Sequence, residues 1–161
     1  MKILSLILLF SCCALNAQNV EGFWKRVHKK TGSTQCVISI YKYQDKYYGR
    51  IIGTFNANGK MKENLYTPED RAEKVSGSPY YCGMDLLWDL KKNGSKYRGK
   101  IVDPRSGKVY DAVIWNKEGN LIVRGELFFV GKNEVWYPLE KGDFPSSFRT
   151  PDPIQFIPSP H

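Results

Sequence analysis

Histidine and recognisable catalytic motifs are scarce in this sequence, and this scarcity limits the chemistry the chain can perform. His28 and His161 are the two histidines among 161 residues. Neither stands at zinc-ligand spacing from a cysteine or beside a serine or cysteine nucleophile. No phosphate loop or nucleophile elbow occurs, and Asp103, Asp111 and Glu126 have no spacing that pairs them for acid–base work. We therefore expect no enzyme, no catalytic residues, no metal site and no cofactor.

Long hydrophobic runs are also lacking, apart from a short one at the N-terminus. Residues 3–15 are mostly apolar and follow Lys2, but a membrane-spanning helix needs about 20 apolar residues. Small residues lead to Ala17, so we predict a signal peptide over residues 1–17 with cleavage before Gln18. Lipoprotein processing at Cys12 is the alternative. The protein is expected to be exported, either periplasmic or secreted, without a transmembrane span.

Acidic residues are fewer than basic ones. The chain has 24 Lys and Arg against 16 Asp and Glu, which gives a formal net charge of +8. The positive charges are scattered along the sequence, and export separates the protein from nucleic acid, so a nucleic-acid partner is not expected. A basic surface that attracts anionic material of the cell envelope is the expectation.

Strand patterns fill most of the remaining sequence. β-Branched and aromatic residues alternate with polar ones, and short Gly-containing turns separate the runs. Short antiparallel strands at such spacing favour a β-sandwich or an up-and-down barrel. Eight strands are predicted, at about Phe23–Val27, Cys36–Tyr43, Lys46–Phe55, Cys82–Leu90, Lys96–Asp103, Lys108–Trp115, Asn120–Leu127 and Glu134–Leu139.

Two segments depart from the strand pattern. Residues 56–80 form a long polar connection in which Thr67, Pro68 and Asp70 have the pattern of a helix start, with Gly77 as the stop. Residues 141–161 contain five prolines and cannot form a central strand. This Pro-rich tail is expected to be extended, and its apolar residues favour partial docking on the barrel over disorder.

Several motifs occur in a fixed order along the chain. They are Gly22-x-Trp24, the hairpin over residues 37–51, Gly99-Lys100-Ile101-x-Asp103-Pro104-x-x-Gly107-Lys108-x-Tyr110, Leu121-x-Val123-Arg124-Gly125 and Gly131-Lys132-x-x-x-Trp136. Over about residues 20–138 this set resembles the bacterial exported family called domain of unknown function 2147. The resemblance implies a small exported, calycin-like (lipocalin-like) β-barrel with no established activity. Together with the strand count, it leads us to expect an all-β, eight-stranded antiparallel up-and-down barrel over residues 18–140, with one short helix in the long connection. The Pro-rich tail at residues 141–161 looks like an addition beyond the core of the family.

Such a barrel would bring four connections together at one rim. These are His28–Thr34, Asn56–Tyr80, Asp103–Gly107 and Phe128–Asn133, and they make the rim basic through His28, Lys29, Lys30, Arg105, Lys108 and Lys132. The segment from Asp103 to Lys108 is interpreted first as a turn, because Asp caps backbone N–H groups and Gly107 accepts a positive φ. The alternative is an anion site through Arg105 and Lys108.

An eight-stranded barrel is either filled by side chains or wide enough for one small ligand. Interior glycines decide between these cases, because Gly49, Gly99 and Gly125 either leave space or relieve strand curvature. The candidate ligand contacts are Trp24, Tyr97 and Tyr110 for an apolar body, with Arg105 and Lys108 for an acidic head.

Two cysteines remain beyond the leader, Cys36 and Cys82. With one strand between them, their Cα atoms would be roughly 9–10 Å apart, beyond the about 7 Å that a disulfide tolerates. A bridge would need the chain before Cys82 to fold inward; otherwise each cysteine is a small buried hydrophobe.

The sequence therefore favours a binding module for a small apolar or anionic ligand in the cell envelope. The alternative is a protein-interaction or envelope-maintenance domain, such as an inhibitor-like barrel with a filled interior. In that case the Pro-rich tail is the candidate contact with an envelope protein.

Overall fold

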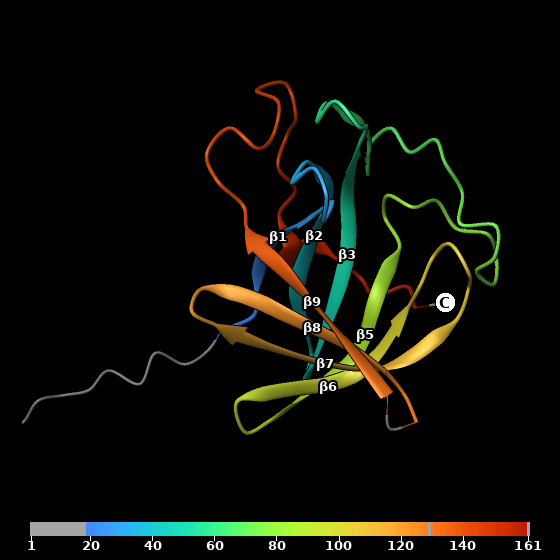
Figure 1. Ribbon diagram of the computed structural model, residues 1–161. Helices are drawn as coiled ribbons and strands as arrows, with labels where there is room; N and C mark the ends of the chain where they lie inside the picture. The colour runs from blue at the N-terminus through green and yellow to red at the C-terminus, as the bar shows by residue number, and fades with distance from the viewer. Residues whose placement is uncertain (1–18, 129, 161) are drawn as a thin grey trace, which may run out of the picture.

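The computed structural model describes residues 19–128 and 130–160, whose regular secondary structure is almost entirely β-strand (Figure 1). The predicted signal peptide lies outside the described residues. In chain order the elements are β1 (Gly22–Val27), β2 (Thr34–Tyr43), β3 (Lys46–Phe55), β4 (Met61–Asn64), β5 (Asp85–Asn93), β6 (Lys96–Val102), β7 (Val109–Lys117), β8 (Asn120–Leu127), β9 (Val130–Pro138) and the single-turn 3-10 helix η1 (Pro153–Gln155). Each of the eight predicted strands is present, and β4 is an addition within the long connection. Among the described residues, no helix has the length and apolar character needed to cross a membrane.

The strands form one antiparallel sheet that closes on itself. Their order is β2-β1-β9-β8-β7-β6-β5-β3-β4, and a further pairing between β2 and β3 completes the ring. That pairing runs from Cys36↔Thr54 to Tyr43↔Lys46, whereas β4 pairs with the last residues of β3, Gly53 to Phe55. The predicted eight-stranded up-and-down barrel is therefore confirmed.

One half of the barrel interior is packed solid. Ile38, Ile40, Leu90, Ile114 and Leu121 are completely or almost completely buried in one core cluster. Val20, which precedes β1, is also fully buried, and its carbonyl accepts a hydrogen bond from Trp24 Nε1 at 2.8 Å. Burial of such side chains supplies most of the favourable free energy of folding. The chain therefore closes this end of the barrel with its own N-terminal segment.

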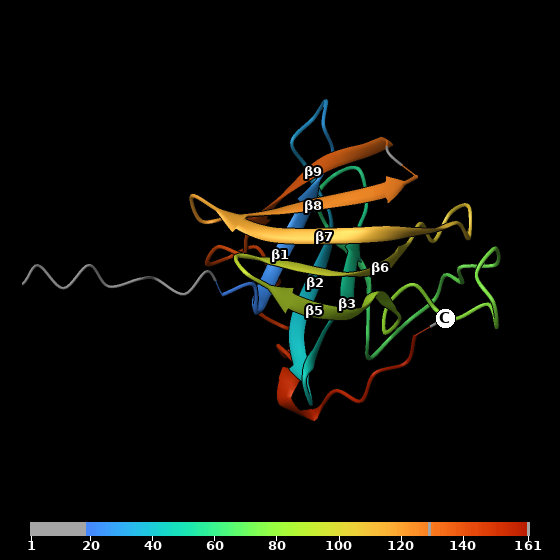
Figure 2. The same ribbon diagram turned by 90° about the horizontal axis from the view of Figure 1, so that it is seen from below.

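The long connections gather at the opposite end. In Figure 2 the β6–β7 connection and the connection over residues 65–84 lie at one end of the barrel, and the β7–β8 turn lies at the other. Contact between the first two is close, because a Cβ added to Gly107 would lie 2.0 Å from the carbonyl oxygen of Lys74. Two of the four connections predicted at the shared rim, those over residues 56–80 and 103–107, therefore lie together.

The helix predicted after Thr67 is wrong. The buried carboxylate of Glu63 accepts hydrogen bonds from the backbone N–H groups of Glu69 (2.7 Å) and Asp70 (3.0 Å). These are donors that a first helical turn leaves free, so the Glu63 contacts alone are compatible with a helix. The backbone groups that follow pair across the loop instead: the Asp70 carbonyl accepts a hydrogen bond from Tyr81 N (2.9 Å), and Ala72 N donates to the Pro79 carbonyl (2.8 Å). The backbone then forms loop pairings, including a bridge between Arg71 and Tyr80. Turns and bridges replace the helix, and the described helical residues are those of η1.

The Pro-rich tail docks along the outside of the barrel as far as the structure describes it. Asp143 forms an ion pair with Lys25 at 3.0 Å, and the rings of Phe144 and Phe23 meet edge to face at 6.5 Å. Farther along, the Phe156 ring contacts Tyr41 at 5.1 Å. The tail is thus a second layer over β1 and β2, in agreement with the docking that its apolar residues predicted.

Cys36 and Cys82 are both free thiols. Cys36 pairs with Thr54 of β3 in the sheet register, so β3 separates it from the segment that carries Cys82. Burial raises the pKa of Cys36 to about 11 and that of Cys82 to about 12. Of the two alternatives, the structure contains the unbridged thiols, with Cys82 buried and Cys36 partly buried against the core.

Candidate ligand-binding pocket

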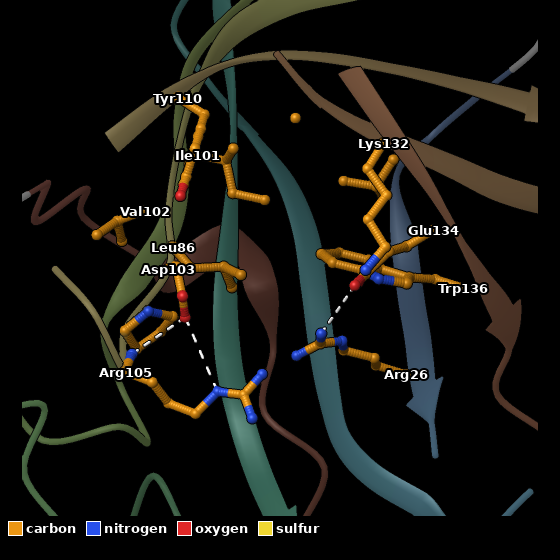
Figure 3. A pocket seen from close by; sticks show the side chains of 13 residues that line it. Arg26, Leu86, Ile101, Val102, Asp103, Arg105, Tyr110, Lys132, Glu134 and Trp136 are labelled. Atoms are coloured by element: carbon orange, nitrogen blue, oxygen red, sulfur yellow. Dashed lines mark hydrogen bonds and ion pairs between the residues drawn. The ribbon is translucent and has the colours of Figure 1, made fainter. Parts of the chain in front are cut away.

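The interior is open at the end where the connections gather. Figure 3 shows this pocket, which has a volume of about 360 Å³. Its apolar lining is Leu86, Ile101, Val102, Tyr110, Val123, Gly125 and Trp136. Leu86, Val123 and Trp136 also belong to the core cluster, so they form the floor where the packed half of the barrel ends.

The interior glycines explain why this half stays open. A Cβ on Gly49 would lie 3.0 Å from Ile40 and Leu87 side-chain atoms, and one on Gly99 would lie 2.5 Å from the Trp88 carbonyl oxygen. Both positions are therefore already filled. A Cβ on Gly125 would meet its nearest atoms, on Ile101 and Tyr110, at an ordinary 3.8 Å. Of these three, Gly125 is the residue that borders open space.

Positive charge surrounds the opening of the pocket. An adjoining hollow of about 680 Å³ shares Arg26, Arg105, Lys132 and Glu134 with the pocket and continues to the β1–β2 connection. Together the two spaces are lined by five cationic side chains and two carboxylates: Arg26, Lys29, Lys30, Arg105 and Lys132, against Asp103 and Glu134. An anionic group would therefore find a favourable potential at this opening.

Arg26 and Glu134 form the one strong ion pair within this lining. Arg26 Nη2 lies 2.9 Å from Glu134 Oε1, across the seam between β1 and β9. Burial alone would lower the pKa of Arg26, but the hydrogen bond and the charge of Glu134 outweigh it and raise that pKa. This pair neutralises one cation and one carboxylate, which leaves Lys29, Lys30, Arg105 and Lys132 against Asp103.

The segment from Asp103 to Lys108 is a turn that also places a cation. The Asp103 carboxylate accepts hydrogen bonds from Arg105 N (3.1 Å) and Ser106 Oγ (2.9 Å), and its carbonyl accepts one from Gly107 N (2.8 Å). Gly107 has the expected positive φ of 71°. The Arg105 side chain reaches the pocket lining, and its Nε is 3.9 Å from the Asp103 carboxylate. The turn is structural, and it delivers Arg105 to the opening.

The floor of the pocket contains a polar atom without a partner. Trp136 is almost completely buried, and its Nε1 donates no hydrogen bond to any described residue. A buried donor that stays unsatisfied costs about 1–3 kcal/mol. This atom is buried within the wall of the pocket, so the cost is carried by the folded protein itself.

The structure brings some of the predicted site residues together and separates others. Tyr110 and Arg105 both line the pocket. Trp24 and Tyr97 are buried in the packed half, where Trp24 binds the Val20 carbonyl and Tyr97 contacts Tyr47 ring to ring at 4.8 Å. The Lys108 side chain is exposed and belongs to neither hollow.

The side chains that β9 and β1 contribute to the pocket lining were not predicted from the sequence. Lys132, Glu134 and Trp136 stand at intervals of two, so they point to the same face of a strand, and Arg26 faces them from β1. This alternation was visible in the sequence, but the pairing of the first strand with the last was needed to connect the two groups.

An antiparallel eight-stranded barrel that is open at one end is a lipocalin-like fold. Protein HP1028 from Helicobacter pylori, described as belonging to the lipocalin family, is a structural match with a TM-score of 0.59 and 16% sequence identity, over 76% of this chain and 84% of that one. Residues 22–137 match the family described as an uncharacterized protein conserved in bacteria, DUF2147. The chain belongs to that family. No curated protein matches it.

Proposed function

We propose that this protein is an exported carrier or sensor that binds a small amphiphilic acid. The apolar body of the ligand lies in the pocket against Ile101, Tyr110 and Val123, and the acidic head lies at the cationic opening. The observation that carries this proposal is a mostly apolar interior space that is partly open and has Arg105 and Lys132 in its lining.

The size of the pocket supports a small ligand. Ligand pockets usually measure about 300–1,000 Å³ and are mostly apolar with a few placed polar groups. The pocket of about 360 Å³ falls at the lower end of this range, and the adjoining basic hollow adds room for a head group. An open upper half also favours the binding module over an interaction domain with a filled interior.

Binding without catalysis is part of the proposal. The carboxylates at the opening are already engaged, Asp103 in its turn and Glu134 with Arg26. Neither has the second acid or base at hand that proton transfer to a substrate would use.

Export is proposed from the leader alone. N-terminal sequencing of the protein recovered from a bacterial envelope fraction should begin at Gln18. A mature chain that begins at lipid-modified Cys12 would replace this with the lipoprotein alternative, and recovery of the intact leader in the cytoplasm would contradict export. Binding of an envelope protein by the tail stays a prediction, because the described tail residues are engaged with their own barrel.

Calorimetric titration with dodecanoate and dodecanol tests the proposed ligand class. We expect the wild type to bind dodecanoate more tightly than dodecanol, because a carboxylate gains from Lys132 and Arg105. Lys132→Gln should reduce this preference several-fold, whereas Lys91→Gln, an exposed lysine of β5 outside both hollows, should leave it unchanged.

Gly125→Val tests whether the probe enters the pocket. The added side chain projects into the open space, so binding of both probes should be lost while the melting temperature is kept. If the wild type binds neither probe, or Gly125→Val binds as the wild type does, the proposal is wrong.

A further inference from the structure

Exposed apolar side chains gather at the turn between β8 and β9. Leu127, Phe128 and Val130 are 53%, 89% and 78% exposed. Val109 is 45% exposed at the start of β7, and the β7–β8 register, which pairs Asp111 with Glu126, places it next to this turn. We call these four residues the apolar tip. A soluble protein gains no stability from leaving such a cluster in water.

The backbone conformation of Phe128 indicates that this residue does not stabilise the folded chain. Phe128 has a φ of 55°, in the left-handed region that Gly, Asn and Asp adopt readily and that bulky residues rarely do. An aromatic ring that is both strained and exposed suits a contact made outside the molecule.

Cations without counter-charges surround the apolar tip. Lys132 follows the tip on β9, and Lys108 lies in the connection just before β7, which begins at Val109. Neither forms an ion pair with a described residue, and the carboxylate nearest to Arg105 is 3.9 Å away. Lys29 and Lys30 line the basic hollow on the far side of Lys132, and they too have no ion pair in the described part of the chain. The excess positive charge is therefore free to meet negative charge outside the protein.

We propose that the apolar tip docks on an anionic lipid bilayer. Phe128, Leu127 and Val130 enter the boundary between head groups and acyl chains, and Lys132, Lys108 and Arg105 contact the lipid phosphates. Apolar insertion combined with electrostatic attraction is the physical basis of peripheral membrane binding. The tip fits a bilayer better than a protein, because a protein interface needs about 800 Å² from each partner, whereas a few protruding side chains suffice for a lipid surface.

Docking would turn the pocket toward the membrane. Figure 2 shows the β8–β9 end of the barrel at the same end as the β6–β7 connection, and Arg105 and Lys132 line both the pocket and the basic hollow. An amphiphilic acid could then pass between the lipid and the pocket without crossing water. This consequence rests on the proposed function, while docking itself stands on the tip and its cations alone.

Co-sedimentation with lipid vesicles tests the docking. The full mature chain should sediment with vesicles of equal parts phosphatidylglycerol and phosphatidylcholine at low salt, and much less with phosphatidylcholine alone. High salt should weaken the binding, because it screens exposed charges. Lys132→Gln and Lys108→Gln should each reduce the partition coefficient about fivefold, the factor expected for about 1 kcal/mol per cation at such a surface.

Phe128→Asp is the decisive variant. It removes the most exposed apolar ring from the tip and should lower vesicle binding roughly tenfold or more. Asp tolerates the positive φ at this position, so the fold is retained, and an unchanged melting temperature should verify this. Ile154→Asp is the matched control, since Ile154 is 86% exposed on η1, which packs against β2 on the outside of the barrel.

The outcomes separate docking from ligand binding. Wild-type protein that stays in the supernatant with anionic vesicles overturns the docking, and so does equal loss of binding in Ile154→Asp and Phe128→Asp. Dodecanoate titration of Phe128→Asp should match the wild type, because Phe128 does not line the pocket. Failure of the proposed ligand class would therefore appear in the titration and leave the vesicle result standing.

Discussion

The carboxylate of Asp85, which is completely buried, receives two parallel hydrogen bonds from Arg50: Nε to Oδ1 at 3.0 Å and Nη2 to Oδ2 at 2.8 Å. The same carboxylate also accepts hydrogen bonds from the Tyr41 hydroxyl (2.9 Å) and from the backbone N–H of Ser159 (2.7 Å). Arg50 also donates to the carbonyl of Ile157 at 2.7 Å. The pair thus joins β3 and β5 to the end of the tail, on the outside of the barrel.

Asp85→Ala should be severely destabilising. Removal of one partner leaves the Arg50 charge buried without compensation, which typically costs about 3–5 kcal/mol. Urea unfolding should show this loss, and limited proteolysis should cleave the tail of the variant faster than that of the wild type. Asp111→Ala is the control, because the Asp111–Lys100 pair is exposed and is expected to contribute about 0–1 kcal/mol. Equal effects of the two substitutions would contradict a structural role for the buried pair.

Gly107→Ala should lower the free energy of unfolding more than the same substitution in an open turn does. Both Gly107 and Gly119 have positive φ angles, 71° and 84°, but a Cβ on Gly119 meets nothing within 4 Å. The difference between Gly107→Ala and Gly119→Ala in free energy of unfolding therefore isolates the contact with Lys74, and we expect about 1–3 kcal/mol from the forced displacement. Equal destabilisation would mean that the two connections separate freely.

Gly99→Ala should lower the free energy of unfolding more than Gly125→Ala does. A methyl group at residue 99 collides with the backbone of Trp88 and Leu90, whereas one at residue 125 meets side-chain atoms at ordinary distances. We expect Gly99→Ala to lose about 1–3 kcal/mol and Gly125→Ala to lose less than about 1 kcal/mol. A large loss in Gly125→Ala would show that the upper half of the barrel is packed after all.

Alkaline pH should destabilise the protein through its buried thiols. Burial raises the pKa of Cys36 from 9.0 to about 11, so the folded state holds this proton more tightly than the unfolded state does. The resulting stability is fully present below pH about 9 and is lost as the pH rises through about 11, by on the order of 2 kcal/mol. Burial also raises the pKa of Tyr41, which acts in the same direction.

Urea unfolding across this pH range measures the effect, with Cys36→Ala as the comparison. The variant should lose less stability above pH about 9, because it lacks the titrating thiol. Native Cys36 should also react slowly with a disulfide reagent at pH about 8, since little thiolate is present. Fast reaction, or identical pH profiles of the two proteins, would contradict the buried, protonated state.

Local patterns predicted the strands well, and they failed where the backbone of the long connection pairs with residues farther along the chain. The alternation in residues 36–43 and the glycines of the turns depend on neighbours in sequence, so they were readable. The helix start at Thr67 had the right local residues, yet the Asp70 carbonyl pairs with Tyr81 N and Ala72 N pairs with the Pro79 carbonyl across the loop. Of the predicted ligand contacts, Tyr110 and Arg105 reach the pocket and Trp24 and Tyr97 do not, because strand parity gives the face of a residue and not its depth in the barrel.

The sequence by itself determined the all-β class, the strand boundaries within a few residues and the excess of positive charge. It also contained the leader from which export is predicted. Periodicity and turn chemistry act over a few residues, so these properties need no knowledge of the rest of the chain. Tertiary structure alone decided which glycine borders open space, where the tail docks, and that Arg26 of the first strand faces Glu134 of the last. Those relationships arise when the sheet closes, because closure brings together residues more than a hundred positions apart and sets how deeply each side chain lies.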